Sequence, residues 1–252
     1  MAARSKKVKK KQYVNKNNFS IDGVQTNKQQ NTSLSIDKTI KPITATQERA
    51  FDMWTQNSNI MLHGVAGTGK TFLALYFALR DVFDLNKSYH KVYIVRSVVP
   101  TRDMGHLPGS QSEKEQVYET PYIPVCNDIF GRDDAYSILK QKRIVEFKST
   151  SFLRGSTFDN AIIVVDEAQN MSDAELHTVM TRVGRNCKII IAGDTRQDDL
   201  TSKRYKEESG LTSFMKILSR MKEFGSIEFQ IEDIVRSTLV KSYIISRYEL
   251  GM

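Results

Sequence analysis

Residues 64–71, GVAGTGKT, follow the pattern G-x-x-x-x-G-K-[ST] of a phosphate-binding loop. The apolar stretch NIMLHG (59–64) leads into the loop and predicts a strand, whereas FLALYFALRDVF (72–83) follows it and predicts a helix. The glycines allow backbone N–H groups to turn toward a phosphate, and the N-terminus of the helix adds its positive end. Strand, loop and helix in this order therefore predict a nucleotide site.

Two side chains of the loop have expected roles in such a site. Lys70 is expected to reach the β- and γ-phosphates, and Thr71 to place its hydroxyl on Mg²⁺. The nucleotide is expected to contact the run from the loop into the helix, namely Gly64, Val65, Ala66, Gly67, Thr68, Gly69, Lys70, Thr71 and Phe72.

Four apolar stretches predict the strands of a sheet, and three of them are nearly continuous, which indicates burial on both faces and a mostly parallel sheet. They are NIMLHG (59–64), KVYIVRS (91–97), AIIVVDE (161–167) and CKIIIAGD (187–194). IVEF (144–147) and SIEFQI (226–231) are weaker candidates. Helices are expected at about 45–56, 70–84, 173–183, 210–223 and 233–248. Residues 98–158 contain four prolines and are expected to form an insertion with short helices near 113–118 and 134–143.

The net charge of +8 is concentrated near the N-terminus. Residues 1–46 carry ten Lys or Arg and two Asp, whereas 47–252 carry 27 basic and 27 acidic side chains. Residues 1–42 contain few apolar side chains and are predicted to be a disordered basic tail. Its KKVKKK run, with Tyr13 and Phe19 nearby, suits contacts with nucleic-acid phosphates and bases, and it equally suits a solvated tail.

Several classes of protein are disfavoured by the composition. No stretch of about 18 apolar residues is present, and no apolar segment follows the basic N-terminus, so neither a membrane span nor a secretory signal is expected. The two cysteines and four histidines do not cluster. We therefore expect no structural metal site and a reducing, cytoplasmic setting.

AIIVVDEAQN (161–170) places Asp166 and Glu167 at the end of a buried strand. Asp166 is expected to hold Mg²⁺, and Glu167 to polarise a water molecule toward the γ-phosphate. In the alternative, one of the two carboxylates caps the following segment.

Two glutamines complete the predicted site. Gln197, in IAGDTRQ (191–197), follows another buried strand and is expected to sense the γ-phosphate or to orient the attacking water. Gln47, in TATQERAF (44–51), can pair with the N6 and N7 edge of adenine. Alone, Gln47 would be an ordinary residue at the start of a helix.

The segments TATQERAF, GVAGTGKT, VVDEAQN and GDTRQ resemble, in this order, motifs of superfamily one helicases. Around them, VRSVVPTRDMGHLPGSQSEKEQVYETPYIPV, FLRGSTFDNA, TRVG and DIVRSTLV resemble the PhoH family of ATPases, over roughly residues 43–250. The resemblance implies a single RecA-like P-loop NTPase domain of the α/β class over residues 43–252, with ATP and Mg²⁺ as ligands. Two departures are Arg96-Ser97, where members have Arg-Pro, and Gly105-His106, where they have Gly-Phe.

The resemblance also implies a setting and further basic site residues. The chain is similar to the short form found in tailed bacteriophages, which implies the cytoplasm of a bacterial host. The family's basic positions correspond to Arg96, Arg154, Arg182 and Arg236.

An arginine usually stabilises the charge that develops on a transferred phosphoryl group. Two-core helicases take it from a second core, and this chain has one core, so Arg236 or Arg154 is expected to enter the site of a neighbouring subunit. That predicts a homo-oligomeric ring, with a hexamer favoured. Alternatively, Arg236 forms a salt bridge with Glu232 within a helix that starts near Ile231.

The sequence therefore predicts an ATPase that moves on or remodels single-stranded nucleic acid, with RNA favoured. A nucleotide-gated, ring-forming binding protein with little turnover is the main alternative. A small-molecule kinase is less favoured, because kinases seldom combine the Asp-Glu pair with a downstream GDxxQ.

Overall fold

The structure is a computed structural model that describes residues 33–36, 39–56, 59–98, 116–153, 155, 157–194 and 210–250. The chain divides into two units, Met1–Ser33 and Leu34–Met252, and the helices and strands below belong to the second. Most of the predicted tail and residues 99–115 of the predicted insertion lie outside the described residues.

Six parallel strands form one sheet in the order β3-β2-β4-β5-β1-β6. The strands are β1 (Asn59–Gly64), β2 (Lys91–Arg96), β3 (Val145–Ser149), β4 (Ala161–Val165), β5 (Cys187–Gly193) and β6 (Phe224–Phe229). The predicted α/β class and parallel sheet are thus confirmed. β5 lies between β1, which leads into the phosphate-binding loop, and β4, which leads into the Asp166-Glu167 pair.

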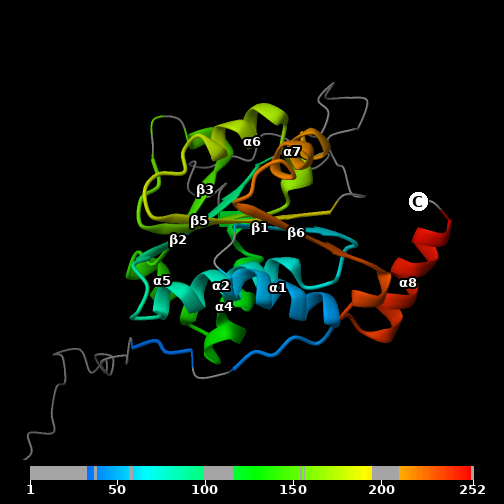
Figure 1. Cartoon of the computed structure of the whole chain (residues 1–252). Coiled ribbons are helices and arrows are strands. Elements are labelled where there is room, and N and C mark those ends of the chain that lie inside the picture. The colour runs from blue at the N-terminus through cyan, green and yellow to red at the C-terminus, as the bar shows by residue number, and fades with distance from the viewer. Residues whose placement is uncertain are drawn as a thin grey trace, which may run out of the picture. The chain divides into compact units, whose positions relative to one another are not determined.

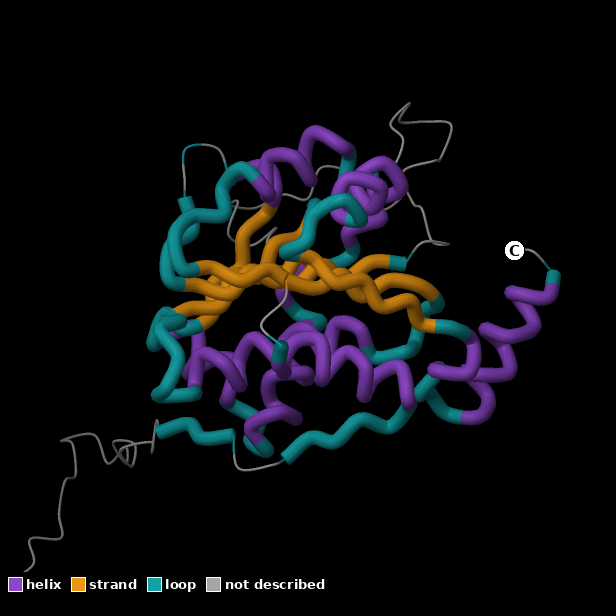
Figure 2. The backbone as a smooth tube through the Cα atoms, viewed as in Figure 1, coloured by secondary structure: helices purple, strands orange, loops and turns teal. Residues whose placement is uncertain are grey.

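Helices cover both faces of the sheet (Figures 1 and 2). On one face lie α1 (Ala45–Thr55), α2 (Lys70–Phe83), α4 (Tyr122–Phe130) and α5 (Ala135–Gln141), and on the other α6 (Asp173–Met180) and α7 (Leu211–Leu218). Each face has its own buried apolar cluster, and the larger cluster lies under α1, α2, α4 and α5. Short 3-10 turns follow β3, β4 and β6 at Thr150–Phe152, Ala168–Asn170 and Ile231–Asp233.

The connection from β2 to β4 contributes α4, α5 and a strand to the core of the fold. It contributes the edge strand β3, as the weaker prediction for 144–147 indicated, and α5 matches the helix predicted near 134–143. The sequence prediction has no helix at α4, since it places the short helices of this segment only near 113–118 and 134–143. Pro121 is the N-cap of α4 and Pro124 lies in its first turn, where a missing N–H group breaks no hydrogen bond.

Two predicted boundaries differ from the structure. Leu34, Ile36 and Ile40 pack against the larger core cluster, so the compact unit begins before residue 43. The last helix, α8, spans Thr238–Glu249 instead of starting at 233. The bond from the Val235 N–H group to the carbonyl of Gly67 holds the preceding segment against the phosphate-binding loop and delays the helix.

No helix in the described part of the chain is both long enough and apolar enough to cross a membrane.

Candidate nucleotide-binding site

The loop between β1 and α2 depends on three glycines with left-handed backbone angles. Gly64, Gly67 and Gly69 have φ values of 111°, 77° and 84°, a region in which other residues are strained. At Gly64, a Cβ atom would lie 2.1 Å from the carbonyl oxygen of Phe229 in β6. The sequence therefore forms a tight turn that leads directly into the N-terminus of α2, a geometry suited to a phosphate.

Lys70 lies folded over this loop. Its Nζ donates to the carbonyl oxygens of Gly64 at 2.9 Å and Val65 at 2.7 Å. Burial lowers the pKa of Lys70, whereas nearby carboxylates, among them Asp194 and Glu167, raise it. The ammonium group is thus placed between the loop and the acidic residues that follow β4 and β5.

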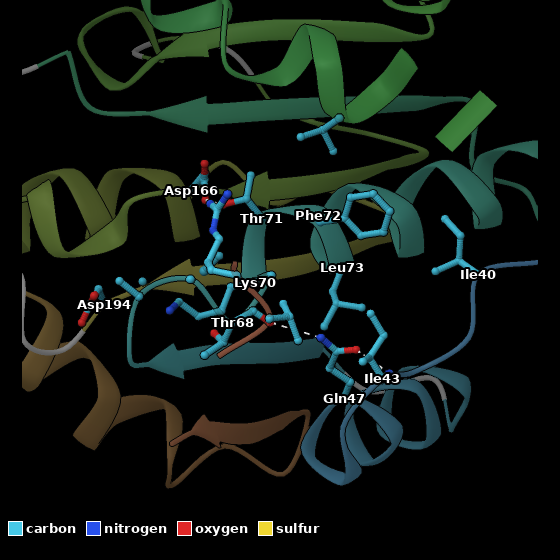
Figure 3. A pocket seen from close by; sticks show the side chains of 18 of the residues that line it. Ile40, Ile43, Gln47, Thr68, Lys70, Thr71, Phe72, Leu73, Asp166 and Asp194 are labelled. Carbon is cyan, nitrogen blue, oxygen red and sulfur yellow. Dashed lines mark hydrogen bonds between the residues drawn. The ribbon is translucent and has the colours of Figure 1, made fainter. Parts of the chain in front are cut away.

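Thr71 and Asp166 meet next to the loop (Figure 3). The Thr71 hydroxyl donates to Oδ1 of Asp166 at 2.9 Å, and Asp166 is 3% exposed. Burial and then the charge of Glu167 raise the pKa of Asp166 to about 6, against the hydrogen bonds from Thr71 and Tyr122. A hydroxyl beside a carboxylate is an oxygen set that Mg²⁺ prefers, so these residues fit the expected metal.

Glu167 has a strained backbone with φ 51° and ψ 45°. Its Oε2 accepts a hydrogen bond from Nε2 of Gln169, and Oε1 of Gln169 accepts from the Asp194 N–H group at 2.9 Å. One buried amide thereby joins the segment after β4 to the end of β5. Strain held by such contacts is typical of functional sites.

Gln47 is buried beside the loop, and its amide is engaged at both ends (Figure 3). Nε2 donates to the carbonyl oxygen of Thr68 at 3.2 Å, and Oε1 accepts from the Ile43 N–H group at 2.8 Å. The two atoms expected to pair with adenine are therefore bound to backbone. In this arrangement Gln47 ties the start of α1 to the loop.

The phosphate-binding loop, Gln47 and Asp166 line a cavity of about 590 Å³. Its polar side is formed by the loop together with Asp166, Glu167 and Asp194. Ile40, Ile43 and Phe72 line the cavity on the side away from Asp194 (Figure 3), and Val125 and Val235 add to an apolar lining that Lys41 and Asp128 interrupt. Phosphates on the polar side and a base on the apolar side would match this division.

Arg236 lines the same cavity and lies against the loop of its own chain. A Cβ on Gly67 would lie 3.0 Å from Cγ of Arg236 and 3.7 Å from its Nε. The alternative salt bridge with Glu232 is absent among the described residues, and Arg236 lies in the link between a 3-10 turn and α8. Arg236 therefore lies in the site of its own chain, and its insertion into a neighbouring subunit stays a prediction.

Arg96 lies at the end of β2, close to the acidic pair. Its Cζ atom lies 5.9 Å from the centroid of the Tyr118 ring. Burial disfavours its charge, but Tyr122, Glu167 and Asp166 more than offset this and raise the pKa of Arg96.

Arg182 does not reach the site. Its carbonyl oxygen accepts a hydrogen bond from the N–H group of Phe158, which precedes β4. This contact lies near the N-terminal ends of the strands, whereas the phosphate-binding loop follows the C-terminal end of β1. Gln197 and Arg154, both predicted to serve the nucleotide, lie outside the described residues.

Two residues of the site were not predicted. Tyr122 of α4 is fully buried and its hydroxyl donates to Oδ2 of Asp166 at 3.0 Å. Burial, followed by the charge of Asp166, raises the pKa of Tyr122 well above its usual range, so the hydroxyl stays a donor. Gln169 lies within the segment VVDEAQN, but only the fold shows that it reaches Asp194.

Similar structures share low sequence identity with the chain. The large terminase of a thermophilic bacteriophage, in complex with ADP, is 12% identical, covering 82% of this chain and 50% of its own, with a TM-score of 0.44. The Pif1 helicase from Candida albicans is 12% identical, covering 84% and 44%, with a TM-score of 0.38.

Similarity in sequence is closer and covers most of the chain. The PhoH-like protein of Mycobacterium leprae is 31% identical over 85% of this chain and 62% of its own, and that of Bacillus subtilis is 32% identical over 84% and 65%. The Escherichia coli protein PhoH is 32% identical over 71% of this chain and 50% of its own. The chain thus spans less than two thirds of the length of these relatives. The family model described as PhoH-like protein matches residues 39–249, and with the loop and carboxylate geometry of a P-loop NTPase this shows that the chain belongs to the PhoH-like protein family.

Proposed function

We propose that the chain hydrolyses ATP with Mg²⁺. The observation that supports this most directly is the 2.9 Å hydrogen bond from the Thr71 hydroxyl to Asp166. It joins the helix after the phosphate-binding loop to the acidic end of β4, which is the arrangement required for a nucleotide with its metal. ATP is the nucleotide that the family resemblance implies.

Each residue of the site has its own proposed role. When bound, Mg²⁺ neutralises charge on the phosphate oxygens. Thr71 and Asp166 would hold it, and Lys70 would turn from the loop carbonyls to the phosphates. Glu167 would accept a proton from the attacking water, in a position fixed by Gln169.

Arg236 is proposed to act in its own site. Its stem packs on Gly67 and its side chain lines the cavity, so its charge is available to the phosphates without a second subunit. Gln197 is proposed to sense the γ-phosphate, on the strength of the GDxxQ segment.

Coupling to single-stranded nucleic acid, with RNA favoured, is the second part of the proposal. It is supported by the ten basic residues among the first 46 and by the family resemblance. A hexameric ring in the bacterial cytoplasm is proposed on the same resemblance, with Arg154 as the remaining candidate for an arginine supplied by a neighbour.

The test measures phosphate release by the wild-type chain and by Lys70→Ala, with and without single-stranded RNA. Light scattering on the same samples measures the mass of the assembly that the chain forms. The proposal expects turnover that depends on Lys70, rises with RNA and accompanies a ring. ATP binding with negligible turnover would instead support the nucleotide-gated binding protein. Transfer of phosphate to an acceptor other than water would support a kinase.

A further inference from the structure

Two hydroxyl groups from two different helices hold the carboxylate of Asp166. Thr71 of α2 donates to Oδ1 at 2.9 Å, and Tyr122 of α4 donates to Oδ2 at 3.0 Å. Tyr122 is the first residue of α4 and has no exposed surface. Because both oxygens are bound, the plane of the carboxylate is fixed from both sides.

The helix that carries Tyr122 also forms part of the nucleotide cavity. Val125 and Asp128, further along α4, line the same 590 Å³ space as Asp166. α4 thus contacts the site at its acidic end and along its wall. The aromatic ring of Tyr122 packs near Phe147 of β3, with centroids 6.1 Å apart, and this contact does not need the hydroxyl.

We propose that Tyr122 is a positioning residue, which holds Asp166 in the orientation that binds Mg²⁺ and so links α4 to the metal site. This rests on the proposed function, because it assumes a nucleotide with Mg²⁺ in the cavity. Tyr122 acts through Asp166 and does not itself contact the nucleotide. Partners that orient a metal-binding side chain commonly change metal affinity by about 10–100-fold.

Tyr122→Phe removes the hydroxyl and keeps the ring. Tyr136→Phe is a matched control, since Tyr136 is also a buried tyrosine whose hydroxyl donates to a carboxylate, that of Glu119, at 2.7 Å. Neither Tyr136 nor Glu119 lines the nucleotide cavity.

The experiment measures the melting temperature of the full chain with ADP while Mg²⁺ is titrated. Tyr122→Phe is expected to need about tenfold more Mg²⁺ for half of the ADP-dependent shift, whereas Tyr136→Phe follows the wild type. Excess Mg²⁺ is expected to restore ATP turnover to Tyr122→Phe.

Equal Mg²⁺ dependence of Tyr122→Phe and wild type would overturn the proposal, even if both variants melt at a lower temperature. A wild-type chain whose ADP-dependent shift does not change with Mg²⁺ would overturn the proposed Mg²⁺ site at Thr71 and Asp166, and the role of Tyr122 with it.

Discussion

Oε1 of Gln169 accepts a hydrogen bond from the N–H group of Asp194 at 2.9 Å, which joins the ends of β4 and β5. The same amide donates through Nε2 to Glu167, whose backbone is held at a strained φ of 51°. The orientation of the expected general base therefore depends on the end of the neighbouring strand.

Gln169→Ala is expected to lower the rate of ATP hydrolysis by roughly tenfold, because the base loses its orientation. The affinity for ADP should stay near that of the wild type, since Gln169 does not line the cavity. Turnover and ADP binding measured on the same preparations check this, with the exposed Gln141→Ala as control. Loss of ADP binding in parallel with turnover would show that Gln169 only supports the fold.

Gln47→Ala is expected to lower kcat/KM for ATP and for GTP by the same factor, roughly tenfold, because it loosens the loop. Both ends of the Gln47 amide are bound to backbone, at Thr68 and Ile43, so base selectivity should not change. The ratio of ATP to GTP turnover is the measurement, and Gln56→Ala, an exposed glutamine at the end of α1, is the control. A loss confined to ATP would restore the role in reading adenine.

Arg236→Ala and Lys70→Ala are each expected to lower turnover by roughly 100-fold or more. A mixture of the two variants should stay inactive, because Arg236 lies against Gly67 of its own chain and serves its own site. Phosphate release is measured after the subunits have been allowed to exchange. Recovery in the mixture would mean that an intact Arg236 acts on a neighbour's intact loop.

Lys188→Met is expected to stabilise the fold at pH 7. Lys188 is 3% exposed, and its Nζ lies 3.4 Å from the ring centroid of Trp54 and 3.1 Å from the Trp54 carbonyl oxygen. Burial lowers the pKa of Lys188 to about 8, from 10.5 in an unperturbed lysine. Below pH 8 the folded state therefore holds a buried charge. Methionine removes this charge, which is expected to raise the free energy of unfolding by roughly 1–3 kcal/mol.

The pH dependence gives the second readout for Lys188. Between about pH 8 and 10.5 the unfolded state binds more protons at this lysine, so wild-type stability gains a contribution that rises with pH. Urea denaturation at pH 7 and pH 9 should show that the advantage of Lys188→Met shrinks at the higher pH. Lys216→Met, at an exposed position on α7, should show no such change. A less stable Lys188→Met at both pH values would mean that the buried ammonium group of Lys188 stabilises the fold.

Local patterns in the sequence were sufficient for the strands and the loop. β1, β2, β4 and β5 lie where the four apolar stretches predicted them, and β1, β4 and β5 are buried along nearly their whole length. α4 is absent from the prediction, and its prolines at 121 and 124 lie at the N-cap and in the first turn, where a helix tolerates them.

Contacts between distant segments could not be predicted in the same way. The bond from Tyr122 to Asp166 spans 44 residues, and it exists because α4 and β4 meet at one edge of the sheet. Gln47 was correctly placed near the loop, but only the fold shows that its amide is already bound. Arg236 is expected in a neighbouring subunit from the count of one core, and only the fold shows that its side chain lines the cavity of its own chain.

Glu167 is proposed to be the base that activates water for the hydrolysis of ATP bound in the cavity. A single-turnover experiment with radiolabelled ATP and Mg²⁺, on wild type and Glu167→Gln, tests it most directly. The wild type is expected to hydrolyse the bound ATP, whereas Glu167→Gln should bind ATP with similar affinity and hydrolyse it at least about 100-fold more slowly. Equal rates in the two proteins, or ATP that the wild type binds and releases intact, would contradict it.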